Sequence, residues 1–162
     1  MLKNIKKFLP TYLVSVAVPL LVGILSALIT KGNMDIYKEI ATPPLAPPSW
    51  LFPVAWTVLY ILMGISYAMV YMKRESDYNT FVKATVIYAI SLVFNFFWSI
   101  LFFNARAFLF SFVWLLALLM FIVLTIINYK KIDKVAAYLQ IPYALWVAFA
   151  GYLNFGIWIL NR

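Results

Sequence analysis

The chain has 162 residues, of which 66% are hydrophobic and only 11% are charged, and its formal net charge is +8. Soluble domains carry roughly 45–50% apolar and about 25% charged residues, so a water-soluble globule of this size could not bury so much apolar surface. We therefore expect an all-α integral membrane protein, a single domain over residues 1–162 that forms a five-transmembrane-helix bundle.

Five stretches without any charged residue carry this prediction: 8–30, 40–72, 84–105, 107–129 and 135–161. A spanning helix needs roughly 20 predominantly apolar residues, whereas barrel strands would show alternating segments of about ten. The expected helices lie near 9–30, 50–72, 82–104, 107–128 and 135–159. Short connections predict that the second to fifth helices are sequential antiparallel neighbours, while residues 31–48 form one long connection, loop 1.

Basic residues gather at the predicted helix ends, which favours a membrane orientation signal over a nucleic-acid partner. Nine lie on the N-terminal side: Lys3, Lys6, Lys7, Lys73, Arg74, Lys83, Lys130, Lys131 and Lys134. Four lie on the other side: Lys31, Lys38, Arg106 and Arg162. We therefore predict a multi-pass cell-membrane protein with a cytoplasmic N-terminus and with loop 1 and the C-terminus outside. The first apolar run exceeds the roughly 7–15 residues of a signal peptide and is expected to remain as a helix.

Loop 1 combines a polar segment, KGNMDIYKEIA, with a proline-rich one that leads into PPLAPPSWLFPVAWTVLY at 43–60. The polar segment is compatible with a short interfacial helix. A PPxxPP sequence cannot be helix interior, because proline fixes φ and lacks a backbone donor. We expect a stiff lid, including Pro47 and Trp50, that joins a helix starting near Ser49 or Pro53 and covers an aromatic site.

Polar and aromatic residues recur at helical spacing in three of the predicted helices, and in lipid such stripes face the bundle interior. The second helix carries Trp56, Tyr60, Gly64, Tyr67 and Tyr71. The third carries Tyr88, Ser91, Asn95, Trp98, Ser99 and Phe102. The fifth carries Gln140, Tyr143, Trp146, Ala150, Asn154 and Trp158. The fourth has almost nothing polar between Trp114 and Thr125, so it is expected to be the most lipid-exposed helix.

Simpler interpretations stay open for many of these residues. Those near helix ends, Tyr71, Tyr88, Trp114 and Trp158, fit interfacial anchors. Asparagines 95 and 154 also fit interhelical hydrogen bonds, worth roughly 0.6 kcal/mol each. The tryptophans at 56, 98 and 146 lie a turn or more inside their helices, where ligand binding and packing are equally good explanations.

Several kinds of chemistry lack their residues. The chain contains no histidine and no cysteine, and no ionisable acid or base lies within a predicted helix core. Embedded proton relays, ordinary haem ligation, metal catalysis and activated nucleophiles all need such groups. We therefore expect no catalytic residue, no metal site and no obligatory cofactor. What remains is an apolar, π-rich cavity suited to a planar ligand.

Three segments carry a family resemblance: PPLAPPSWLFPVAWTVLYILMG at 43–64, NFFWSILFF at 95–103 and PYALWVAFAGYLN at 142–154. Together they resemble the TspO/MBR family, the tryptophan-rich sensory or translocator proteins. The resemblance implies a five-helix bundle, usually a homodimer in bacteria, that binds porphyrins such as protoporphyrin IX or a haem-related tetrapyrrole. It also implies pocket roles for the matching residues Trp56, Asn95, Trp98, Trp146 and Asn154.

Some positions depart from the family pattern. Ile36–Tyr37 replaces a frequent Trp–Tyr pair, Leu45 lies where many members have tryptophan, and the C-terminal sterol motif is incomplete. Phe155 occupies a tyrosine position there, and Arg162 lies too far from Tyr152. Such motifs are weak, and we expect poorer recognition of cholesterol than of porphyrin.

Three functions follow as hypotheses: a tetrapyrrole receptor or carrier, a tryptophan-dependent light-driven breakdown of porphyrin, and a structural membrane adaptor without a saturable ligand. The first is favoured, and the chain is not expected to be an ordinary enzyme. The candidate ligand-binding residues are Trp56, Tyr60, Asn95, Trp98, Tyr143, Trp146, Ala150, Asn154, Pro47 and Trp50.

Overall fold

Five membrane-spanning helices form the protein, as the sequence predicted. The computed structural model describes residues 2–162 and the side chains from Phe8 onward, so the predicted charge cluster Lys3, Lys6 and Lys7 lies outside the described side chains. Long helices are α1 (Leu2–Thr30), α3 (Leu51–Met72), α4 (Tyr78–Ser99), α5 (Phe108–Ile132) and α7 (Ile141–Leu160). Short elements are η1 (Lys31–Asn33), α2 (Ile36–Glu39), the π-helical η2 (Ile100–Asn104) and α6 (Lys134–Leu139). All five spans are long and apolar enough to cross a membrane.

The last span is broken where the chain contains proline. α6 ends at Leu139 and α7 begins at Ile141, with Pro142 in its first turn. Proline has no N–H to continue the α-helical ladder but is tolerated in a first turn, so the break falls here. The buried Gln140 at the break donates to Ser66 Oγ (3.1 Å), and Ser66 donates to the carbonyl of Ala136 (2.8 Å). This polar contact joins the broken span to α3.

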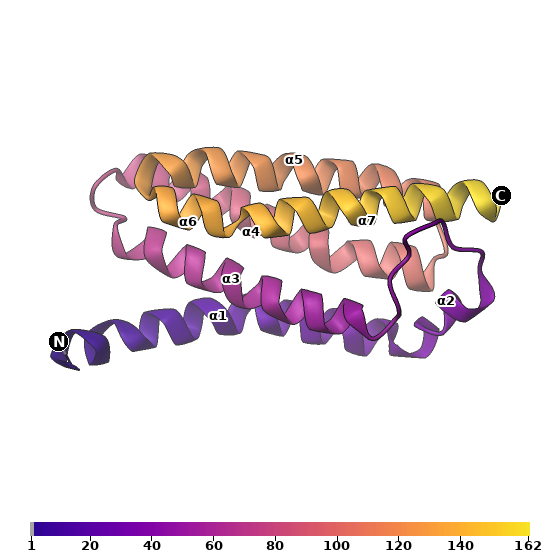
Figure 1. Ribbon diagram of the computed structural model, residues 1–162. Coiled ribbons are helices and arrows are strands. Elements are labelled where there is room, and N and C mark those ends of the chain that lie inside the picture. Colours follow the sequence, from indigo (N-terminus) through magenta and orange to yellow (C-terminus); the bar gives the residue numbers. More distant parts are fainter. Residues whose placement is uncertain (1) are drawn as a thin grey trace.

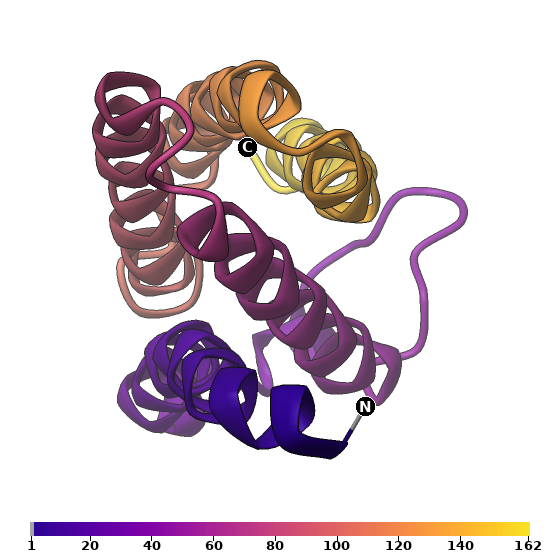
Figure 2. The ribbon, with the colours of Figure 1, turned by 90° about the vertical axis from the view of Figure 1, so that its left-hand side faces the viewer.

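The order of the helices around the bundle differs from the prediction. α1 packs between α3 and α4, and the ring continues through α5 to α6 and α7, which close it against α3 (Figures 1 and 2). The second and third spans, α3 and α4, therefore face one another across the interior rather than packing side by side. Stripes of polar residues identify the interior side of a helix but not its neighbours, so this order could not be predicted from them.

Two glycines allow α1 to approach α3 closely. A Cβ on Gly64 would lie 2.4 Å from Val16 Cα and 2.6 Å from the carbonyl oxygen of Ser15. A Cβ on Gly23 would lie 2.2 Å from a ring carbon of Tyr60. Only glycine fits at such crossings, where small residues let helices pack in lipid without a hydrophobic driving force.

α1, and not α5, is the span with the smallest buried share, so the prediction that the fourth span is the most lipid-exposed was wrong. In the most apolar 18-residue segment of each helix, 22% of α1 is buried inside the protein, compared with 28% of α5. α5 packs against α4, α6 and α7, whereas α1 packs mainly against α3 and α4. Lack of polar residues on α5 therefore reflects an apolar interface with its neighbours as well as contact with lipid.

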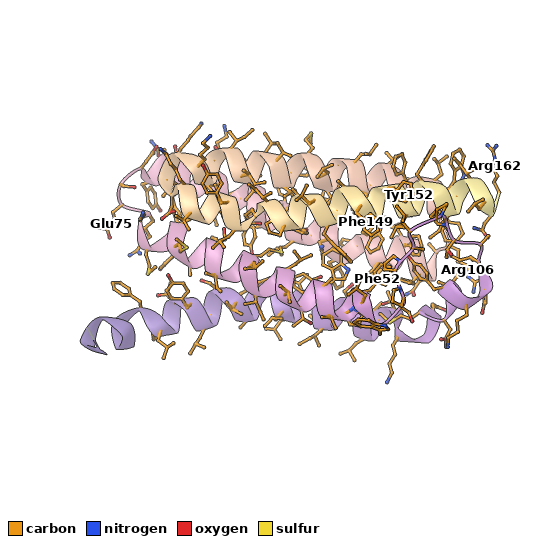
Figure 3. The ribbon with its side chains drawn as sticks, in the orientation of Figure 1. Phe52, Glu75, Arg106, Phe149, Tyr152 and Arg162 are labelled. Atoms are coloured by element: carbon orange, nitrogen blue, oxygen red, sulfur yellow. The ribbon has the colours of Figure 1, made fainter. Side chains whose placement is uncertain are left out.

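Loop 1 is fastened to the end of α7. Asn161 exchanges two hydrogen bonds with the backbone of Ala41 (2.9 and 3.0 Å), and Tyr152, labelled in Figure 3, donates to the carbonyl of Pro44 (2.9 Å). Pro43 lies so close to Gly156 that a Cβ there would be 2.7 Å from the proline Cβ. The predicted short helix is present as α2. These contacts fix the proline-rich segment over the bundle end that we call the loop-1 end.

Candidate functional site

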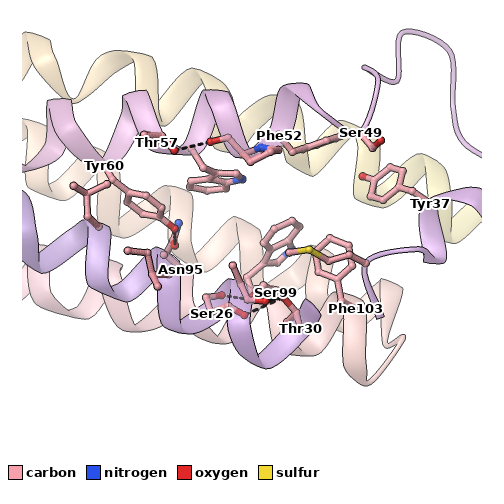
Figure 4. A pocket seen from close by; sticks show the side chains of 18 of the residues that line it. Ser26, Thr30, Tyr37, Ser49, Phe52, Thr57, Tyr60, Asn95, Ser99 and Phe103 are labelled. Atoms are coloured by element: carbon pink, nitrogen blue, oxygen red, sulfur yellow. Dashed lines mark hydrogen bonds between the residues drawn. The ribbon is translucent and has the colours of Figure 1, made fainter. Parts of the chain in front are cut away.

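A cavity of about 470 Å³ lies between α1, α3 and α4 near the loop-1 end (Figure 4). This volume falls within the range of about 300–1,000 Å³ typical of small-molecule pockets. α3 contributes one wall with Phe52, Trp56 and Tyr60, and α4 contributes the opposite wall with Asn95 and Trp98. The remaining lining comes from α1, from α2 and the turn before it, from Ser49 and from Phe103 of η2.

Aromatic rings dominate the inner part of the cavity. Trp56 stacks on Tyr60 with 5.5 Å between ring centroids, and its ring lies 6.4 Å from that of Trp98 at an angle of 35°. Ring centroids 4.5–7 Å apart are in direct aromatic contact, so no planar group fits between the two indoles as they stand. A flat ligand would instead lie across both rings, along the side that faces α1.

Hydrogen bonds between helices fix the position of these walls. Tyr60 donates its hydroxyl to Asn95 Oδ1 (2.7 Å), and Asn95 Nδ2 donates to the hydroxyl of Tyr143 (3.1 Å). Asn95 thus joins α3, α4 and α7 in the interior, and it is 4% exposed. Since these polar groups bond to one another, Tyr60 presents its ring to the cavity rather than a free hydroxyl.

Asn154 forms a second buried polar junction, which orients Trp98. Its Oδ1 accepts from Trp98 Nε1 (3.2 Å) and Ser111 Oγ (3.0 Å), and its Nδ2 donates to the carbonyl of Phe108 (2.7 Å). The indole N–H of Trp98 is therefore directed away from the cavity toward α7. This wall therefore presents an aromatic surface without a free hydrogen-bond donor, and such a surface suits an apolar ligand.

A group of aromatic residues narrows the loop-1 end of the cavity. Tyr37 lies 5.2 Å from Phe52 and 6.3 Å from Phe103 between ring centroids (Figure 4). Burial raises the pKa of Tyr37 to about 12, so it stays neutral at physiological pH.

The only described basic side chain in the lining is that of Lys38, which pairs with Asp35 (2.6 Å). A hydrogen bond to the Asp35 carboxylate raises the pKa of Lys38 and keeps it cationic.

Nine of the ten predicted site residues fall into three groups. Trp56, Tyr60, Asn95 and Trp98 line the cavity. Tyr143, Ala150 and Asn154 are buried behind the cavity wall. The ring of Tyr143 packs on that of Trp56 with 6.2 Å between ring centroids, and Asn154 accepts the hydrogen bond of the Trp98 indole. Pro47 and Trp50 do not line it, and Trp50 is 65% exposed.

Trp146 is separated from the cavity by another ring. Its indole lies 6.0 Å from Phe52, which does line the cavity, and its Nε1 is buried without a hydrogen-bond partner among the described residues. We expected the fifth span to form the third wall, but the structure places α1 in that position. Helical periodicity placed Trp146 on the interior stripe of the fifth span, but it could not show that Phe52 would lie between Trp146 and the cavity.

The α1 wall was missed by the sequence analysis. It consists of Leu20, Gly23, Ile24, Ser26, Ala27 and Thr30. Ser26 and Thr30 lie one turn apart in the apolar second half of α1, and Gly23 precedes them by another turn, which is a weak signal of an inward face. The hydroxyl of Ser26 is hydrogen-bonded to that of Ser99 on α4, and Thr30 donates to the carbonyl of Ser26 (2.9 Å).

Together, the fold and cavity define a five-helix integral membrane protein with an aromatic site between its spans. The chain belongs to the TspO/MBR family, whose profile matches residues 15–159, and this confirms the resemblance seen in the sequence. It is 40% identical to "Tryptophan-rich protein TspO" of Chlorobaculum tepidum, over 77% of this chain and 78% of the relative. Identity to the protein of the same name from Archaeoglobus fulgidus is 37%, over 91% and 94% of the two chains. A more distant relative is "Translocator protein" of Bos taurus, 32% identical over 89% and 86%.

Proposed function

We propose that the protein is a membrane receptor or carrier for flat apolar molecules of the tetrapyrrole class, with protoporphyrin IX as the first ligand to test. The observation that carries the proposal is the cavity between α1, α3 and α4, where Trp56 and Trp98 present ring surface within the membrane span. Relatives named as translocator and tryptophan-rich sensory proteins support a role in carrying or sensing.

The lining favours a ligand with an apolar body and a polar edge. Its inner part consists of the rings of Trp56, Tyr60 and Trp98, and the polar atoms of Tyr60 and Trp98 are bonded within the protein. At the loop-1 end the lining changes to Asp35, Lys38 and Ser49. The macrocycle would lie across Trp56 and Trp98, and its carboxylates would lie near the Lys38 ammonium and the Ser49 hydroxyl. Charge-assisted contacts of this kind fix orientation, while ring burial supplies most of the affinity.

The test is a titration of the full chain in phosphatidylcholine nanodiscs with protoporphyrin IX, followed by quenching of tryptophan fluorescence. We expect saturable binding with one site per chain. Performing the titration in the dark and then under light separates binding from light-driven breakdown, because only breakdown changes the absorption spectrum of the probe. The control is empty nanodiscs to which free tryptophan is added. If quenching of the native chain rises linearly with probe concentration without saturating, as it does in this control, the proposal is refuted.

Orientation and assembly are part of the proposal. The charge distribution supports a cytoplasmic N-terminus with the loop-1 end outside, and family membership supports pairing of two copies. Because the chain has no cysteine, single cysteines at Gly32 and at Ser76, near opposite ends of the bundle, report the orientation cleanly. An impermeant maleimide added to intact cells should label the first and not the second.

A further inference from the structure

The cavity has an opening in its side, between α1 and α3. Eight of its lining residues are also exposed. Met34, Asp35, Lys38 and Ser49 lie toward loop 1, and the other four lie farther along the bundle: Ile24 and Ala27 on α1, and Pro53 and Thr57 on α3. Ile24 is 53% exposed. A side chain that borders a cavity and also reaches the outer surface marks a rim, so these four residues outline a slit that we call the side portal.

The side portal lies at the depth of the lipid. Ile24 and Ala27 belong to the span Phe8–Asn33, and Thr57 lies inside the span Leu51–Met72. The hydroxyl of Thr57 donates to the carbonyl of Pro53 (2.8 Å), so it bonds within its own helix. The rim therefore offers an apolar surface to the acyl chains, and an apolar ligand dissolved in the bilayer can reach it without crossing water.

Close helix contact borders the portal on the side away from loop 1. Gly23 lies against the ring of Tyr60, and Gly64 lies against the backbone at Val16. On its other face α1 is joined to α4 by the Ser26–Ser99 hydrogen bond, and η1 is joined to η2 by Asn33 Nδ2 donating to Asn104 Oδ1 (2.9 Å). The opening is thus confined to the α1–α3 side and to the half of the bundle nearest loop 1.

Loop 1, in contrast, is held on the bundle by several contacts. Ile36 is 1% exposed, and the ring of Tyr37 packs on Phe52 and Phe103. Hydrogen bonds from Asn161 and Tyr152 hold the loop on α7, and an ion pair of 3.2 Å joins Arg106 to Glu39. Entry along the bundle axis would require loop 1 to lift and these contacts to break together.

We propose that ligands enter and leave sideways from the bilayer through the side portal, while loop 1 stays closed. This inference rests on the proposed function, since it describes access to the same cavity. Beyond the side portal, the exposed part of the lining continues from lipid depth to Asp35, Lys38 and Ser49 at the loop-1 end. It therefore suits a planar amphiphile whose body lies among acyl chains while its anionic edge stays at the membrane surface.

Two variants separate the sideways route from the axial one. Ala27→Phe narrows the portal, and Ala17→Phe is the matched control because Ala17 is exposed on the same helix and does not line the cavity. Pro43→Cys with Gly156→Cys locks loop 1 on α7 through a disulfide in a chain that has no other cysteine. The ideal Cβ positions are 2.7 Å apart and must separate by about 1 Å to reach the usual disulfide spacing. The reduced form of the same protein is its own control.

The experiment measures association and dissociation rates of protoporphyrin IX by stopped-flow quenching in phosphatidylcholine nanodiscs. We expect Ala27→Phe to slow both rates by at least about tenfold, with a smaller change in affinity, and Ala17→Phe to leave them within about twofold. The oxidised loop lock should load as fast as its reduced form. The association rate should also rise with the amount of probe in the bilayer at constant aqueous concentration.

A loop lock that slows loading as much as Ala27→Phe, or an Ala27→Phe protein that loads at the native rate, would overturn the side portal while leaving the proposed function intact. Absence of saturable binding by the native chain would instead refute the proposed function, and the portal with it. The two failures are distinguished by the native titration alone.

Discussion

Replacing Asn95 by alanine tests the buried junction that holds the cavity walls together. The substitution removes the bonds of 2.7 Å from Tyr60 and 3.1 Å to Tyr143, which join three helices. Interhelical hydrogen bonds in membranes average roughly 0.6 kcal/mol each, so two of them contribute about 1.2 kcal/mol. Leaving both tyrosine hydroxyls buried without this partner adds a desolvation cost, and we expect a total loss of about 1–3 kcal/mol.

Reversible unfolding in mixed micelles by increasing sodium dodecyl sulfate, followed by far-ultraviolet circular dichroism, measures this loss. Tyr60→Phe removes only one of the two bonds and should cost about half as much, while the ring that lines the cavity is retained. Because one interaction is shared, the cost of the double variant should be smaller than the sum of the single costs. A change below about 0.3 kcal/mol for Asn95→Ala, or strict additivity, would contradict this account of the junction.

Two further predictions concern the crossing of α1 and α3 and the end of the bundle opposite loop 1. Gly64→Ala should destabilise the fold by about 1–3 kcal/mol, because its Cβ would overlap the backbone at Val16, whereas Gly32→Ala, with open space around it, should stay within about 0.5 kcal/mol in the same unfolding assay. Burial tends to raise the pKa of Asp133, but its 2.6 Å ion pair with Lys73 and two backbone N–H groups outweigh this and hold the pKa below its ordinary value. Its stabilising effect should therefore be complete above the ordinary carboxyl pKa of about 3.9 and disappear as pH falls through the lowered value. The unfolding midpoint of the native chain should therefore fall as the pH is lowered from about 6 to about 2.5. An equal fall in the midpoint of Asp133→Asn would contradict this role of Asp133.

Much of the fold could be predicted because lipid imposes simple rules on a chain. Charge-free runs marked all five spans, and the boundaries of α3 and α7 lie within two residues of the prediction at their loop-1 ends. Stripe periodicity also placed Asn95 and Asn154 in the interior. These successes share one cause, since both depend on the cost of exposing polar groups to hydrocarbon.

What could not be predicted depends on pairs of residues far apart in the sequence. α1 packs between α3 and α4, and its close contact with α3 depends on the fit of Gly64 against Val16 and of Gly23 against Tyr60. The sequence contains these glycines but does not show which residues they contact. Similarly, Trp146 follows the expected stripe but lies behind Phe52. The position of a single ring decides whether a neighbouring residue lines the cavity, and helical periodicity does not contain that information.

The most direct test of the account is the structure of the protein with protoporphyrin IX bound in a lipid bilayer. We predict that the macrocycle lies across Trp56 and Trp98 between α1, α3 and α4, with its carboxylates toward Lys38. A macrocycle bound on the lipid-facing side of the bundle, or held against α5 and α7 without contact to Trp56 and Trp98, would contradict the central claim.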